Sequence, residues 1–186
     1  MADNSPKKWF KLEESFFNGV DQKLLEKLRQ QAATDQEATA IQRLTGLNDL
    51  KVCKAIAELN ISVESLAALR LAPLVAVAWA DDRVQDDERF QVLKAAEKAG
   101  LARGDASYEL LESWLSKRPP LDLFDTWIEY ARSLSQSLDG EARENLRKNI
   151  VAQVREVAEA SGGILRFGSV SPTEKKMIER IDAALA

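Results

Sequence analysis

The chain has 186 residues, with 26 Lys and Arg against 30 Asp and Glu, and a formal net charge of −4. Apolar residues make up 45% and charged residues 30%, a composition typical of a globular chain long enough to bury a core without covalent staples. The lack of a dense basic run argues against nucleic-acid binding, and the longest apolar run, residues 71–80, is shorter than the roughly 20 residues that a membrane-inserted helix needs.

The sequence contains no histidine and one cysteine, Cys53. The lack of histidine excludes Ser-His-Asp and Cys-His catalysis, and together with the lone cysteine it excludes a zinc site built from His and Cys ligands. Cys53 lies on the apolar face of a predicted helix, so we expect a buried, inert thiol. One thiol and a polar N-terminus without a signal peptide favour a cytoplasmic protein. Any metal would be a hard ion bound by carboxylates.

Helical periodicity dominates the first sixty residues. The first predicted helix has four apolar positions on one face: Val20, Leu24, Leu25 and Leu28. Thr34 and Glu37 form a capping box that predicts a second helix start, and Gly46 predicts its end. The predicted buried face of this second helix is Ala38, Ile41 and Leu44. Asn48 is expected to cap a third helix, which buries Val52, Ile56 and Leu59.

The middle of the chain predicts the most buried helix. Ser62 is the expected N-cap of a helix that Pro73 must bend or break. Residues 74–80 are apolar on all sides, which indicates a position at the centre of a bundle. Asp81 and Asp82 are expected to end this helix.

Five further predicted helices follow. The first runs from about 86 to 99, and the second from Asp105 to the Pro119-Pro120 break. The third and fourth follow apolar stripes at 121–138 and 146–157, and the fifth runs from a Ser171 N-cap to the end. Each helix places apolar residues on one side, and Leu121 begins the stripe of the third helix. The tryptophans on these helices, Trp79, Trp114 and Trp127, are expected in the core. Residues 161–170 are glycine-rich but lack a Gly-Lys-Ser/Thr signature, so they are predicted to be a connector rather than a phosphate site.

A composition shift near Asn60 predicts two parts, an N-terminal helical extension over 1–60 and a core bundle over 61–186. The extension carries the aromatic pairs 9–10 and 16–17. These either staple the extension onto the bundle or dock a protein partner, and stapling is favoured.

Two helix starts resemble one another. Val84 precedes Glu88, and Val170 precedes Glu174, at the same spacing and after a turn. In each, valine anchors the chain entry and glutamate at the third helical position caps free amides. Two such units predict two helical hairpins packed as pseudo-repeats.

The fuller motif is an apolar helix over 71–80, then Asp81-Asp82-Arg83-Val84, then Glu88. It resembles the tellurite-resistance TerB-like family, which includes the TerB-like domain of membrane-anchored DnaJ-type co-chaperones. The resemblance spans about 62–186 and is strongest over 71–101. It implies an all-α, multi-helix bundle of paired helical hairpins, a stress-response role, and a divalent metal held by Asp81, Glu88 and Glu174. Asp82 stands where the family has glycine, and Phe167 stands where the second half would carry an aspartate.

The acidic turn admits two interpretations. Asp at helix ends and first turns is ordinary capping chemistry, and this reading is favoured. The other reading is the divalent-cation site. An EF-hand is excluded, because Arg83 would occupy a ligand position. We therefore expect a non-enzymatic module without catalytic or cofactor-binding residues, with a metal-free protein-interaction scaffold and a carboxylate-only enzyme as alternatives.

Overall fold

The computed structural model describes residues 6–160 and 170–186, and the side chains of residues 6–23 and 25 lie outside the described part. Within these ranges the chain forms eight α-helices and one 3-10 helix, with no strand. The predicted all-α bundle is confirmed. The aromatic pairs 9–10 and 16–17 and the glycine-rich segment 161–169 fall outside the described side chains and residues, so the expectations for them stay predictions.

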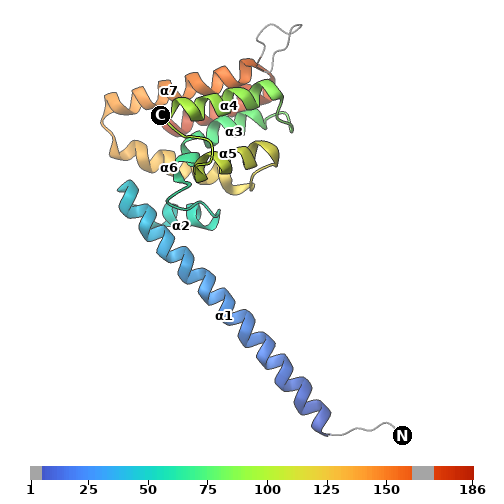
Figure 1. The fold of residues 1–186 in the computed structure, drawn as a ribbon. Helices are drawn as coiled ribbons and strands as arrows, with labels where there is room; N and C mark the ends of the chain where they lie inside the picture. The colour runs from blue at the N-terminus through green and yellow to red at the C-terminus, as the bar shows by residue number, and fades with distance from the viewer. Residues whose placement is uncertain (1–5, 161–169) are drawn as a thin grey trace.

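The helices form a bundle with one long projecting arm (Figure 1). Their bounds are α1 Pro6–Thr45, α2 Leu50–Glu58, η1 Leu66–Leu71, α3 Ala72–Ala78, α4 Asp86–Lys98, α5 Ala106–Ser116, α6 Asp122–Ser137, α7 Gly140–Ala160 and α8 Pro172–Leu185. Helix α3 is central and packs against α6, α7 and α8, while α4 packs on α7 and α2 on α6. Of the helices in the described ranges, none is sufficiently long and apolar to cross a bilayer.

Helix α3 is as buried as its sequence predicts. Leu74, Val75 and Val77 each expose 1% of their surface or less. Pro73 lies in the first turn of α3 and follows the 3-10 helix η1, where its missing N–H costs no helical hydrogen bond. The predicted helix start at Ser62 is wrong. The Ser62 amide donates to Ser65 Oγ at 2.9 Å, a local bond that stabilises a turn rather than a helix.

The predicted helix start at Thr34 is also wrong. Helix α1 continues unbroken for 40 residues, and the Thr34 hydroxyl donates back to the Gln30 carbonyl at 3.0 Å, as it does inside a helix. Neither proline nor glycine interrupts residues 20–45, so nothing separates the two predicted helices. Helix α1 ends before Gly46, whose φ of 70° confirms the predicted stop. Leu44, predicted to be buried, is 62% exposed.

Helix α2 packs between α1 and α6 and buries part of its surface in the core. Its N-cap is Asp49 rather than Asn48, with Asp49 Oδ1 accepting from the Lys51 amide at 2.9 Å. Val52 and Ile56 are buried, as expected, while Leu59 is half-buried. Cys53 is fully buried, as the sequence predicts, and this burial raises the pKa of its thiol.

The helices from α4 onward begin and end close to their predicted positions. Trp114 and Trp127 are buried, and the half-buried Trp79 donates from Nε1 to the Trp114 carbonyl at 2.7 Å. Leu121 does not join the buried stripe and is 86% exposed. It precedes the first turn of α6, directly after the Pro119-Pro120 break, and so lies outside the helical periodicity.

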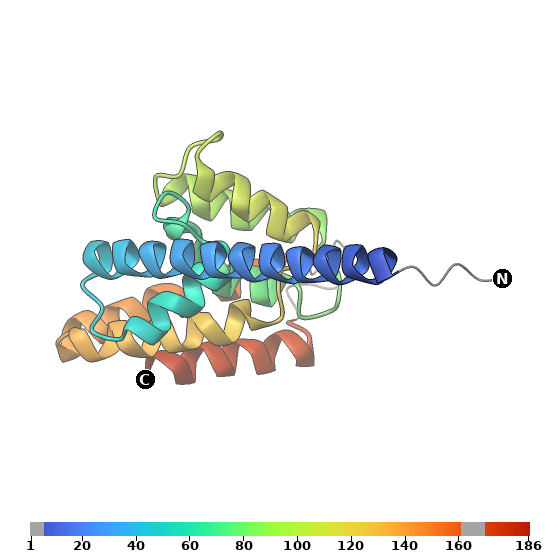
Figure 2. The same cartoon turned by 90° about the horizontal axis from the view of Figure 1, so that it is seen from below.

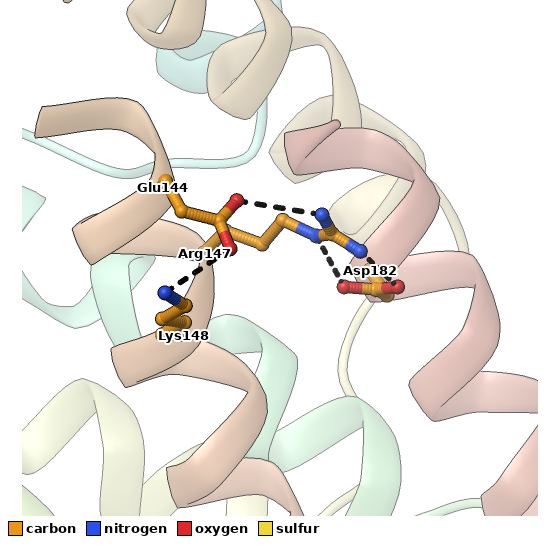
Figure 3. A network of polar contacts seen from close by, with 4 residues as sticks. All are labelled: Glu144, Arg147, Lys148 and Asp182. Carbon is orange, nitrogen blue, oxygen red and sulfur yellow. Dashed lines mark hydrogen bonds and ion pairs between the residues drawn. The ribbon is translucent and has the colours of Figure 1, made fainter. Parts of the chain in front are cut away.

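Helices α7 and α8 pack side by side and are joined by a polar network (Figure 3). Arg147 Nε and Nη2 donate to the two carboxylate oxygens of Asp182 at 2.6 and 2.8 Å. Glu144 accepts from Arg147 at 3.4 Å and pairs with Lys148 at 3.5 Å. The two-pronged geometry is the strong form of the Arg–carboxylate pair and fixes how the two helices align.

Helix α1 projects away from the bundle. Figure 1 shows α2 beside only its C-terminal part, and in the turned view of Figure 2 its first turns extend past the other helices. Lys54 pairs with Asp35 at 2.7 Å, and Glu37 Oε1 accepts from the Val63 amide at 2.6 Å. These contacts hold the C-terminal part of α1 on the bundle.

Candidate functional site

The acidic turn between α3 and α4 contains a left-handed residue, Asp82, with a φ of 63°. Asp82 stands where the TerB-like pattern has glycine, and Asp tolerates the left-handed region better than most residues. The Asp82 carboxylate accepts from Arg118 Nη1 at 2.7 Å. Asp82 therefore faces the chain segment after α5 and is not part of the cluster that contains Asp81.

Helix α4 starts as the valine–glutamate spacing predicts. Gln85 is the N-cap, and its amide donates to Glu88 Oε2 at 2.7 Å. The Glu88 side chain thus folds back over the helix start and satisfies an amide that has no helical partner.

Helix α8 starts in the same way. The Ser171 amide donates to Glu174 Oε2 at 2.6 Å, and the Glu174 amide donates to Ser171 Oγ at 3.2 Å. Pro172 occupies the first turn. The reciprocal pair is the complete capping box expected from the sequence.

The fold brings these two helix starts together. Glu88 and Glu174 expose only 3% and 1% of their surface, and Glu174 is near enough to raise the pKa of Glu88. Asp81 lies at the exposed rim, where its Oδ1 accepts from Ser171 Oγ at 3.1 Å and also from Thr173 Oγ1. The three predicted residues therefore gather at one junction, two of them buried and one exposed.

The buried carboxyl group of Glu88 binds its proton more tightly than an exposed glutamate does. Burial raises the pKa of Glu88 to about 7, and the negative charges of Glu174 and Asp81 add to the rise, while the Gln85 amide opposes it. Neighbouring carboxylates repel when ionised, and protonation of Glu88 removes its part of that repulsion. Near neutral pH the Glu88 carboxyl group is therefore close to the midpoint of its titration.

The geometry offers little to a metal ion. Across residues 6–160 and 170–186, no group of three His, Cys, Asp or Glu side chains is arranged to hold one. Glu88 and Glu174 each use an oxygen to cap their own helix, and Asp81 is occupied by two hydroxyls. A cation at the predicted ligands Asp81, Glu88 and Glu174 would share each carboxylate with a bond that already occupies one of its oxygens.

Sequence reasoning did not foresee the contact between Asp81 and the two hydroxyls of α8. Ser171 was expected only as an N-cap, and Thr173 had no role. The two segments lie about ninety positions apart in the chain, and no spacing rule links them. Their only signal is the pairing of two similar helix starts, which suggests packing but not which side chains meet.

Comparison of the chain with protein families, with characterised proteins and with solved structures returned no match. The TerB-like resemblance therefore rests on the motif around residues 71–101.

Proposed function

We propose that this protein is a metal-free, non-enzymatic interaction module that associates with a second copy of itself through the projecting part of α1. The observation that carries the proposal is the exposed apolar face of α1: Leu24 and Leu28 are 53% and 52% exposed. Large apolar side chains in a row on a soluble protein mark an interaction surface. The buried glutamate pair supports a structural role, since side chains this enclosed are closed to a substrate.

The exposed face is the continuation of the face that α2 covers. Ala38 and Ile41 are fully buried where α1 meets α2. At about 100° per residue, positions 20 and 24 fall on the same side of α1 as Ala38. Position 20 and Leu24 therefore lie on the side of α1 that α2 covers further along the helix, with Lys27 and Gln31 between the two apolar parts.

The contact with α2 ends at a groove where Lys27, Gln31 and Asp35 of α1 meet Lys54 and Glu58 of α2. From Pro6 to Lys27, the first residue of this groove, α1 spans roughly 32 Å of helix. A stripe of this length matches another amphipathic helix, which would lie antiparallel to α1 in line with α2.

The charges on the stripe favour a second copy as the occupant. Glu13 and Lys27 stand equally far from Val20, one on each side, and all three positions fall on the same side of the helix. In an antiparallel pair centred on Val20, Glu13 of each chain meets Lys27 of the other. In a two-fold symmetric dimer this contact between residues 13 and 27 occurs twice. Opposite charges at such positions set the relative orientation of two helices.

Charge reversal tests the pairing by sedimentation velocity on the full chain. Glu13→Lys and Lys27→Glu alone are each expected to weaken the dimer at least tenfold, and the double variant is expected to restore it. Leu28→Asp should also weaken association. Leu44→Asp is the matched control, because Leu44 is 62% exposed on the same helix but lies beside Gly46, at the opposite end from the projecting part. A double variant that stays as weak as the single variants would refute the pairing.

A second candidate is the metal-binding, TerB-like module in stress response, and the convergence of Asp81, Glu88 and Glu174 favours it. That candidate expects Mg²⁺, Ca²⁺, Mn²⁺ or Zn²⁺ to raise the melting temperature, and Asp81→Asn with Glu88→Gln to abolish the rise. The metal-free proposal expects no rise with any of the four ions.

A further inference from the structure

A cavity of about 230 Å³ lies among η1, α6 and α7, on the bundle rather than on the arm. Its walls are mainly apolar and include Leu71, Trp127, Leu134, Leu146, Ile150 and Leu185. Arg70, Tyr130, Asn149 and Gln153 supply the polar groups. An apolar chamber with a few polar groups on its lining is the usual form of a small-molecule site.

Arg70 is a cation without a carboxylate partner in the described part of the chain. A second hollow, beside Trp79, is also lined by arginines and differs in this respect. There Arg118 pairs with Asp82 at 2.7 Å and Arg180 with Asp125 at 3.3 Å. The guanidinium of Arg70 therefore remains available to an anion at the cavity.

Tyr130 complements Arg70. The tyrosine is half-buried, and the positive charge of Arg70 is near enough to act on its hydroxyl. Burial raises the pKa of Tyr130, against the opposing influence of Arg70, so the hydroxyl stays protonated and can donate a hydrogen bond. Arg70 and Tyr130 together offer donors to one acceptor group.

We propose that this cavity binds a small carboxylic acid with an apolar ring or short chain, its carboxylate held by Arg70 and Tyr130 and its apolar part against Trp127, Leu134 and Ile150. The volume of the cavity agrees with a ligand of this class. An apolar cavity of about 150 Å³ binds benzene, so the present volume accommodates a ring with a short side chain. None of these residues belongs to α1 or to the glutamate pair, so the site does not depend on the proposed self-association.

The test uses phenylpropanoate as the probe and phenylpropanol as its uncharged counterpart, titrated into the full chain by calorimetry. Wild-type protein is expected to bind the acid at least tenfold more tightly than the alcohol. Arg70→Gln should weaken binding of the acid at least tenfold and leave binding of the alcohol unchanged, as expected for the loss of a charge-assisted hydrogen bond. Arg118→Gln is the matched control and should change neither.

A second variant tests the cavity itself. Ala67 lines it and is half-buried, so Ala67→Leu fills part of the space and should abolish binding of both compounds while circular dichroism stays unchanged. Three results would overturn the proposal. Wild-type protein could give no heat of binding at millimolar phenylpropanoate. Arg70→Gln and Arg118→Gln could lose affinity for the acid equally, or Ala67→Leu could bind both compounds as wild type does.

Discussion

The buried pair of Glu88 and Glu174 makes the stability of the bundle depend on pH in an unusual direction. A carboxyl group whose pKa is raised on folding binds more protons in the folded state than in the unfolded state over the interval between the two values. For Glu88 that interval runs from the ordinary value of 4.5 up to about 7. Stability should therefore fall as pH rises through this range, whereas paired surface carboxylates produce the opposite trend.

The magnitude follows from the width of the interval. Each pH unit corresponds to about 1.4 kcal/mol for one proton, so the full interval amounts to at most about 3 to 4 kcal/mol. The loss is complete about one unit above pH 7, where Glu88 is ionised in both states. Because the chain contains no histidine, few other side chains titrate between pH 5 and 8, and the effect is open to direct measurement.

Glu88→Gln isolates the effect. Glutamine keeps the shape of a protonated glutamate, can accept from the Gln85 amide and can donate to Glu174. In urea unfolding, the variant should match wild type near pH 5 and exceed its free energy of unfolding by up to about 3 to 4 kcal/mol at pH 8. Glu179→Gln is the control, because Glu179 is exposed on α8, the helix that carries Glu174. Its stability should depend on pH as that of the wild type does. Parallel pH curves for wild type and Glu88→Gln would show that no proton is held at the junction.

Three smaller predictions test other parts of the fold. Asp82→Ala is expected to be about 1 kcal/mol less stable than Asp82→Gly, because both lose the carboxylate but only alanine resists the left-handed backbone; equal unfolding midpoints would contradict this. Asp182→Asn should cost about 1 kcal/mol by removing the two-pronged contact with Arg147, with a smaller loss in high salt, and chemical denaturation measures both. Cys53 should react with a thiol reagent only as the protein unfolds in urea, so rapid modification of the native chain would refute its burial.

Much of the bundle was predictable because its helices depend on local signals. The valine–glutamate spacing located the starts of α4 and α8 correctly, and Gly46 and Gly100 mark helix ends where φ is 70° and 87°. Caps and left-handed residues act over a single turn of chain, so a sequence reveals them.

The errors arose where a local signal competed with a longer-range cause. Thr34 and Glu37 form a plausible capping box, but Glu37 instead accepts from the Val63 amide across the chain. Ser62 is a good N-cap by type, yet its amide binds Ser65 in a turn. In both cases hydrogen bonds elsewhere used the groups that capping would have required.

For the acidic junction, the sequence indicated which residues to consider but not their protonation or their burial. The resemblance to the TerB-like family named Asp81, Glu88 and Glu174, and the fold places the three near one another. The sequence could not show that Glu88 and Glu174 would be nearly fully buried, and burial decides whether carboxylates attract a cation or share a proton. The cavity beside Arg70 was not foreseen at all, because η1, α6 and α7 contribute its lining from distant segments.

The mass of the protein in solution tests the proposed self-association most directly. Sedimentation equilibrium at tens of micromolar should give twice the 20.7 kDa chain mass for the full chain, and a monomer for the chain lacking residues 1–18, with unchanged helical content in the bundle. A full-length chain that remains monomeric at this concentration, or a truncated chain that still forms dimers, would contradict the role given to α1.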